Sequence, residues 1–238
     1  MTVFVNLNRR DLSGIHHHRI VGRLSAALED RRLHTTTPPQ ITRHIRQLIQ
    51  KVVPGGMALY MTVQPEADAS ERECFPNVEA KIARAGGRLL CGWQLWEWPH
   101  VMVEAEFHAV WLSPEGRMVD LTPKPHHETT VLFVPDARQS YSGTTVDNVR
   151  LPVRDDQLIR HFIGVSEAIT RVLSRGVSAA AHGHVSVPAH QIEPLQQAQQ
   201  FLGQALLSGL RDHQPCLCGS GSKYKRCHGR ELERAFAL

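Results

Sequence analysis

The chain lacks any apolar run that approaches the ~20 residues of a membrane-spanning helix. Its first residues, MTVFVNLN, also lack the basic region followed by an apolar region that marks a secretory leader. Only five cysteines occur in 238 residues, which excludes a dense disulfide framework. These absences predict a cytoplasmic protein with reduced thiols and no membrane span.

A strong charge of either sign is also missing. The net charge is only +4, far short of the clustered basic charge of a nucleic-acid-binding domain. The hydrophobic content is an ordinary 42 %, enough for one core and an appendage. Composition therefore predicts a globular protein and favours no particular class of partner.

Apolar periodicity predicts an α+β fold in three parts. Helices are expected at 41–53 and from Cys74 to the Gly86-Gly87 pair, with strands at 57–63, 89–98, 101–112 and 117–121. Two more helices are expected at 155–173 and 193–211, with a Gly- and Ala-rich linker near 176–188 between them. The expected parts are a core with an N-terminal helical segment, a helical extension and a small C-terminal module, at 1–150, 151–212 and 213–238.

The C-terminal module places three of the five cysteines beside a histidine. The candidate ligands are Cys216, Cys218, Cys227 and His228. Three thiolates and an imidazole make a four-ligand tetrahedral set for zinc, and the Gly-Ser-Gly-Ser run between them lets the backbone turn tightly. Because a full protein ligand set leaves no open position for a substrate, this zinc would be structural.

The run from Pro215 to Gly229 closely resembles the SEC-C motif, the zinc hook of the SecA translocation ATPase and of many unrelated bacterial proteins. All four ligand positions and the Gly-x-Gly-x-x-Tyr-x-x-Cys-His spacing match. The resemblance implies a bacterial protein that is recruited to a protein partner through its zinc hook. Basic residues around Tyr224 suit an acidic or phosphate-bearing surface, or form the solvated face of the hook: Lys223, Lys225, Arg226 and Arg230.

The strand at 101–112 carries a candidate catalytic histidine. Its odd positions form an almost unbroken apolar face, whereas His108 lies on the other face with two glutamates. We therefore expect His108 to be accessible. A three-residue turn at 114–116 would place Asp120 on the same face and diagonal to His108, about 7 to 8 Å away, whereas a turn of even length would separate them.

Cys74 is expected at a helix N-terminus, where the partial positive charge and free amide donors favour a thiolate and can hold an oxyanion. A Cys-His-Asp triad would then consist of Cys74 as nucleophile, His108 as base and acid, and Asp120 fixing the tautomer of the imidazole.

The order of these residues resembles the transglutaminase-like branch of the papain-fold hydrolases over roughly residues 59–125. The matching runs are Cys74-Phe75-Pro76-Asn77, Gly92-Trp93, His108-Ala109-Val110-Trp111 and Asp120-Leu121-Thr122-Pro123. The resemblance implies a helix packed on an antiparallel sheet. It also implies a cysteine-dependent hydrolase or acyl transferase that acts on amide or peptide bonds.

Two other interpretations stay open. Glu106, His108 and Asp120, with His126 or His127, can be read as a catalytic metal site, which leaves Cys74 without a role. Alternatively, the core is an inactive fold and the chain is a non-enzymatic, zinc-hooked adaptor that binds other proteins.

Overall fold

The computed structural model describes residues 2–6, 35–124, 126–141, 146–175, 177–178 and 184–236. Its contacts divide the chain into two compact units. We call residues 35–153 the sheet unit, and residues 154–238 together with strand β1 (Thr2–Asn6) the helical unit. The division differs from the expected three parts for two reasons. The helical extension and the C-terminal module pack together, and β1 pairs with β9 (His184–Pro188) of the helical extension.

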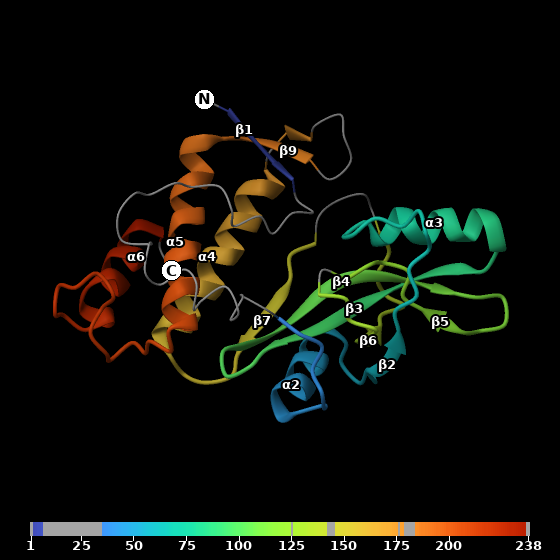
Figure 1. The fold of residues 1–238 in the computed structure, drawn as a ribbon, viewed down its shortest axis with the longest axis horizontal. Coiled ribbons are helices and arrows are strands. Elements are labelled where there is room, and N and C mark those ends of the chain that lie inside the picture. The colour runs from blue at the N-terminus through green and yellow to red at the C-terminus, as the bar shows by residue number, and fades with distance from the viewer. Residues whose placement is uncertain are drawn as a thin grey trace. The chain divides into compact units, whose positions relative to one another are not determined.

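The sheet unit combines two helices with a six-stranded sheet in which all named strand pairs are antiparallel (Figure 1). The strand order is β2-β6-β3-β4-β5, and β7 pairs with β4. The elements follow the chain as α2 (Arg43–Val52), β2 (Leu59–Thr62), α3 (Cys74–Ala85), β3 (Arg88–Trp98), β4 (Met102–Leu112), β5 (Met118–Val119), β6 (Thr130–Pro135) and β7 (Val149–Pro152). Each strand and helix expected in this part of the sequence is present, within a few residues of its expected bounds.

The sheet curls into a near-barrel because its two ends meet. Val63, which follows β2, bridges to Asp120, which follows β5, and the backbone N–H of Gln64 donates to the Asp120 carbonyl at 2.8 Å. Inside the curl lies an apolar cluster of Met61, Val63, Val110, Val131 and Phe133. The even-numbered face of β4 is therefore interior.

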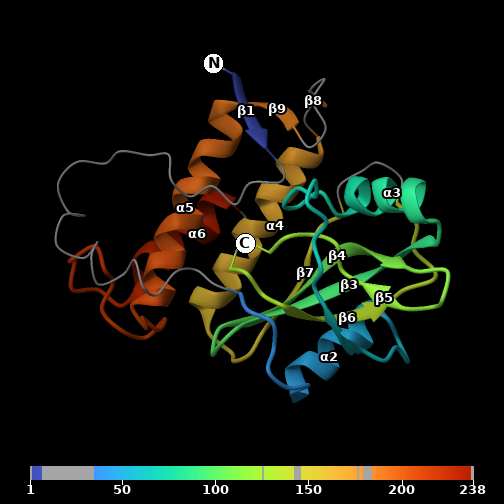
Figure 2. The ribbon, with the colours of Figure 1, turned by 45° about the vertical axis from the view of Figure 1, so that its right-hand side comes forward.

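Helices α2 and α3 both pack against odd-numbered residues of the β3–β4 hairpin. They lie apart from one another, α2 low and α3 high in the view of Figure 2. Helix α2 packs near one end of the hairpin, against Trp93, Leu95, Val103 and Ala105. Helix α3 packs nearer the other end, against Cys91, Ala109 and Trp111. Both long strands are thus buried on two sides.

The turn between β4 and β5 has the three-residue form, one of the two alternatives that the sequence left open. Ser113 donates its N–H to the Arg117 carbonyl at 2.8 Å, and Gly116 has a φ of +84°, a left-handed conformation that glycine adopts without strain. Trp111 pairs with Val119, so Asp120 falls diagonal to His108 on the interior face.

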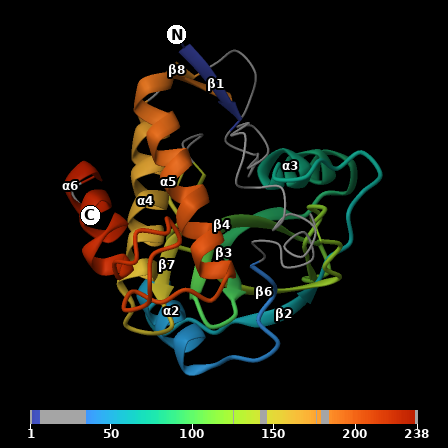
Figure 3. The same cartoon turned by 60° about the vertical axis from the view of Figure 1, so that its left-hand side comes forward.

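The helical unit contains α4 (Gln157–Ser174), β8 (Val177–Ser178), β9 (His184–Pro188), α5 (Ala189–Leu207), the 3₁₀ turn η2 (Tyr224–Arg226) and α6 (His228–Phe236). Helices α4 and α5 pack side by side, and α6 lies against α4 (Figure 3). None of the helices in the described ranges is long and apolar enough to cross a membrane.

The stretch expected to be a linker near 176–188 contributes two strands instead. Strand β9 pairs with both β1 and β8 in a three-stranded antiparallel sheet, and residues 179–183 lie outside the described part of the chain. The small and polar residues of this stretch gave no strand signal, although His184–Pro188 forms β9. This strand is stabilised by pairing with β1 at the N-terminus.

Candidate functional site

Four potential metal ligands gather in the C-terminal hook, which we define as residues 214–230. One ligand atom from each of Cys216, Cys218, Cys227 and His228 lies within 4.8 Å of all the others. The Sγ atoms of Cys218 and Cys227 are 3.5 Å apart, and Sγ of Cys216 is 3.3 Å from Nδ1 of His228. Ligand atoms around a tetrahedral zinc ion are about 3.6 to 3.8 Å apart, given Zn–S and Zn–N bonds of about 2.3 and 2.1 Å. The cluster therefore fits a tetrahedral metal site.

Local backbone geometry explains how a short segment assembles this cluster. Gly219 and Gly221 have φ values of +77° and +73°, which let the chain reverse between Cys218 and Cys227. The N–H of Cys216 donates to the Ser222 carbonyl at 2.8 Å and closes the loop. His228 begins α6, so a helix fixes the last ligand.

Hydrogen bonding prepares one of the thiols for coordination. Hydrogen bonds with Ser220 and, less strongly, with Cys227 lower the pKa of Cys218 to about 6. Burial instead raises the pKa of Cys216. Metal ligation requires the thiolate form. Nδ1 of His228 also lies 3.5 Å from Sγ of Cys227, so Nδ1 is the nitrogen that faces the sulfurs.

A second polar cluster lies in the interior of the sheet unit. Nε2 of His108 is 3.0 Å from Oδ2 of Asp120, and Nζ of Lys124 is 2.6 Å from the same oxygen. Oδ1 of Asp120 accepts the backbone N–H of Thr122 at 2.9 Å, and Lys124 also donates to Oε1 of Gln94 at 3.0 Å. The structure therefore brings His108 and Asp120 together.

His108 is not accessible, contrary to the expectation from its polar strand neighbours. Only 5 % of the residue is exposed, and Asp120 is fully buried. The reason is the curl of the sheet, which turns the even-numbered face of β4 inward and sets the imidazole 6.5 Å from the Phe133 ring, measured between ring centroids.

Electrostatics favours the ionised form of this pair. Burial and, less strongly, the charge of Lys124 act to lower the pKa of His108, but the charge and hydrogen bond of Asp120, together with Cys74, raise that pKa to about 9. Burial acts to raise the pKa of Asp120, but the charges of His108 and Lys124 hold it well below its usual range. At neutral pH the ring is an imidazolium beside a carboxylate.

Cys74 is the first residue of α3, as the sequence indicated, and it is almost fully buried. It packs with Cys91 and Ala109 on the odd-numbered face, whereas His108 points to the interior face. No hydrogen bond joins the thiol and the imidazole in the described part of the chain.

The alternative metal site in the sheet unit is not assembled. Oε2 of Glu106 accepts from Nε1 of Trp96 at 2.8 Å. Within the described ranges, the hook is the one group of three or more His, Cys, Asp or Glu side chains close enough to hold a metal ion.

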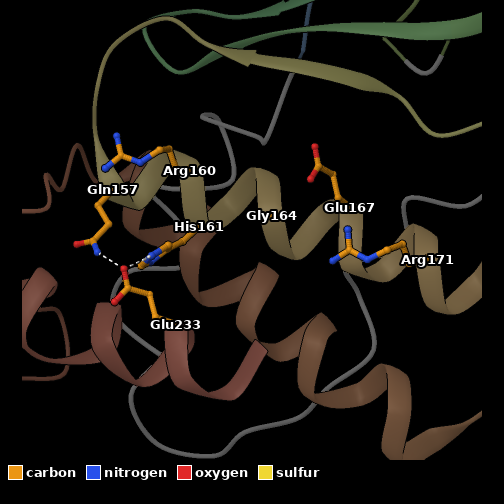
Figure 4. Close-up of a pocket in the computed structure, with 7 residues that line it drawn as sticks. All are labelled: Gln157, Arg160, His161, Gly164, Glu167, Arg171 and Glu233. Atoms are coloured by element: carbon orange, nitrogen blue, oxygen red, sulfur yellow. Dashed lines mark hydrogen bonds and ion pairs between the residues drawn. The ribbon is translucent and has the colours of Figure 1, made fainter. Parts of the chain in front are cut away.

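The sequence carried no sign that Lys124 and Gln94 are partners of His108 and Asp120. Lys124 follows Asp120 by four positions in an irregular segment, where spacing carries no rule for contact. Nor did it single out His161, an ordinary position in an amphipathic helix. A cavity of about 350 Å³ lies beside His161, lined by polar residues of α4 and by Glu233 of α6 (Figure 4).

The comparisons with known proteins concern the hook. The SEC-C motif family matches residues 214–230. Over 53 residues the chain is 45 % identical to the protein translocase subunit SecA of Ralstonia nicotianae. The matching region covers 22 % of this chain and 6 % of that SecA protein. No solved structure matches the chain significantly. The chain therefore carries a SEC-C motif at residues 214–230, with a Cys/His cluster that fits a metal site.

Proposed function

We propose that the hook binds one zinc ion and that the protein docks on a protein partner through it. The observation that carries the proposal is the tetrahedral spacing of three sulfurs and one imidazole nitrogen. This donor set suits zinc, and a closed set of four makes the ion structural. The residues that would hold it are Cys216, Cys218, Cys227 and His228 through Nδ1.

The surface of the hook supports a role in docking. Leu217 is 51 % exposed, and four basic side chains that follow it in the hook are also exposed: Lys223, Lys225, Arg226 and Arg230. An exposed apolar residue and exposed cations in one short segment suit a partner with an acidic surface. In this interpretation the protein is a zinc-hooked adaptor, and the sheet unit has a structural role.

Two measurements test this function. Elemental analysis of freshly purified protein should give one zinc per chain, and Cys227→Ser should release it, because loss of one ligand of four opens the site. Binding of the protein to its partners in a bacterial lysate should weaken in the charge-reversed variant Lys225→Glu/Arg226→Glu, while zinc stays bound. Purified protein without zinc would refute the proposal.

A second candidate function is a cysteine-dependent hydrolase or acyl transferase of transglutaminase-like fold in the sheet unit. It is favoured by the His108–Asp120 pair, because a carboxylate at Nε2 leaves Nδ1 of the ring to exchange protons with a nucleophile. The Cys74 thiolate would attack an amide carbonyl to form a thioester, and His108 would protonate the departing amine. Water or another amine, deprotonated by His108, would then attack the thioester, expel the Cys74 thiolate and leave His108 protonated again.

This second function requires the α3 N-terminus and the curl of the sheet to open, since Cys74 and His108 are buried. The test is labelling with an electrophilic amide-mimic probe and mass mapping of the labelled cysteine. Cys91 is a matched control, because it is equally buried in the same cluster. Selective labelling of Cys74 that His108→Ala abolishes would support catalysis, whereas equal labelling of both thiols would leave the adaptor as the function.

A further inference from the structure

Tyr224 anchors the hook in the helical unit. It stands between the ligands Cys218 and Cys227 in sequence, and its side chain is fully buried. Its hydroxyl lies 2.8 Å from Nδ1 of His161 on α4. Gly229 allows this close packing, since a Cβ added there would come within 3.2 Å of the Tyr224 ring.

A second contact fixes the ring that receives Tyr224. Nε2 of His161 is 3.5 Å from Oε1 of Glu233 on α6, and Gln157 donates to the same oxygen, so two α4 side chains converge on one α6 carboxylate (Figure 4). Burial lowers the pKa of His161, although Glu233 opposes this, so the ring is neutral at pH 7. Because a carboxylate only accepts, Nε2 carries the proton and Nδ1 accepts from the Tyr224 hydroxyl.

The metal-ligand histidine is itself held by α5. The Phe201 ring stacks on the His228 ring, with centroids 4.8 Å apart and planes 28° apart. Nδ1 of His228 faces the sulfurs of Cys216 and Cys227 in this orientation. A ligand ring held in its coordinating orientation loses less freedom when the metal binds.

We propose that α4 and α5 hold the hook in the conformation that binds metal, with His161 and Phe201 as positioning residues. Metal binding and the packing of the hook on these two helices are then coupled. The proposal rests on the proposed zinc binding. Metal binding orders Tyr224 against His161 and His228 against Phe201, and each of these contacts in turn favours the coordinated form of the hook. The hook of this chain is then part of the helical unit and not an independent module.

The experiment is a competition titration of zinc against a chromophoric chelator on the full chain. Phe201→Ala and His161→Leu should each weaken zinc binding by about 10- to 100-fold, the range seen when partners of metal ligands are removed. Tyr224→Phe, which keeps the ring and removes the hydroxyl, should weaken binding no further in a His161→Leu background. Added zinc should raise the unfolding temperature of the helical unit, measured by far-UV circular dichroism, less in the variants than in the wild type.

The control variant is Ile192→Ala. Ile192 is a fully buried residue of α5 that packs against Val187 and away from the hook contacts named above. Zinc affinities of Phe201→Ala and His161→Leu within twofold of the wild type would overturn the proposal. An equal loss in Ile192→Ala would also overturn it, because affinity would then follow general stability. Wild-type protein that binds no zinc would instead refute the metal function on which the proposal rests.

Discussion

Asp120 and His108 form a buried ion pair in the interior of the curled sheet, with Oδ2 and Nε2 3.0 Å apart. The three-residue turn between β4 and β5 sets them diagonal to one another, and the bridge between Val63 and Asp120 closes the sheet over them. Lys124 adds a second cation on the same carboxylate oxygen. The stability of the sheet unit therefore depends on one carboxylate that compensates two buried positive groups.

The first prediction is that Asp120→Asn destabilises the sheet unit by about 3 to 5 kcal/mol, because it leaves Lys124 buried without a counter-charge. Denaturant unfolding followed by tryptophan fluorescence measures this, since all four tryptophans lie in the sheet unit. Asp120→Asn/Lys124→Met should recover part of the loss. A double variant no more stable than Asp120→Asn would contradict the charge argument.

The second prediction concerns pH. The pKa of His108 is raised to about 9 in the folded protein, above its ordinary value of 6.5. The folded state therefore binds the proton more tightly than the unfolded state, so this stabilisation is complete below about pH 6.5 and is lost as pH rises towards 9. Unfolding free energies at pH 6, 7.5 and 9 should fall in that order. His108→Gln should flatten the trend, and an unchanged slope in that variant would assign the pH dependence to another group.

The third prediction concerns Gly92, which pairs with His108 across the hairpin. A Cβ at this position would lie 2.4 Å from Cζ of Phe133 and from the Val134 carbonyl oxygen. Gly92→Ala should therefore cost about 1 to 3 kcal/mol through overpacking in the core. Gly116→Ala is a matched comparison, because its Cβ meets no atom within 4 Å and only its positive φ is unfavourable. A smaller cost for Gly92→Ala than for Gly116→Ala would show that the core accommodates the methyl group.

Local sequence patterns predicted those parts of the fold that depend on neighbouring residues. Alternation in 101–112 and the turn residues that follow it predicted β4 and β5, and left two turn lengths open, of which the three-residue form puts His108 and Asp120 on one face. They did not predict the burial of His108, because that depends on the bridge from Val63 to Asp120, 57 positions apart. The exposure of a strand face is decided by such pairings.

The same distinction applies to the candidate sites. The hook ligands lie within 13 positions, so their spacing alone predicted a metal cluster. The contact between His161 and Tyr224 joins residues 63 positions apart, and nothing in either local pattern indicates it. The packing of Cys74 with Cys91 and Ala109, on the face opposite His108, likewise depends on how α3 packs on β3 and β4.

The last prediction follows from the contacts of the hook with the helical unit. The sequence alone predicts that removal of the chain from Pro215 onward leaves the core folded, because a linker tethers the hook; it predicts nothing for the helical extension. The structure shows Tyr224 fully buried and bonded to His161, and Leu232 of α6 buried as well. Truncation should therefore expose an apolar site on α4 and α5 and lower the unfolding temperature of the helical unit, by several degrees for each 1 kcal/mol lost. Tryptophan fluorescence should show the sheet-unit transition unchanged, while far-UV circular dichroism should show loss of helix at lower temperature. A truncated chain whose helical transition matches that of the full chain would show that these contacts contribute nothing to stability.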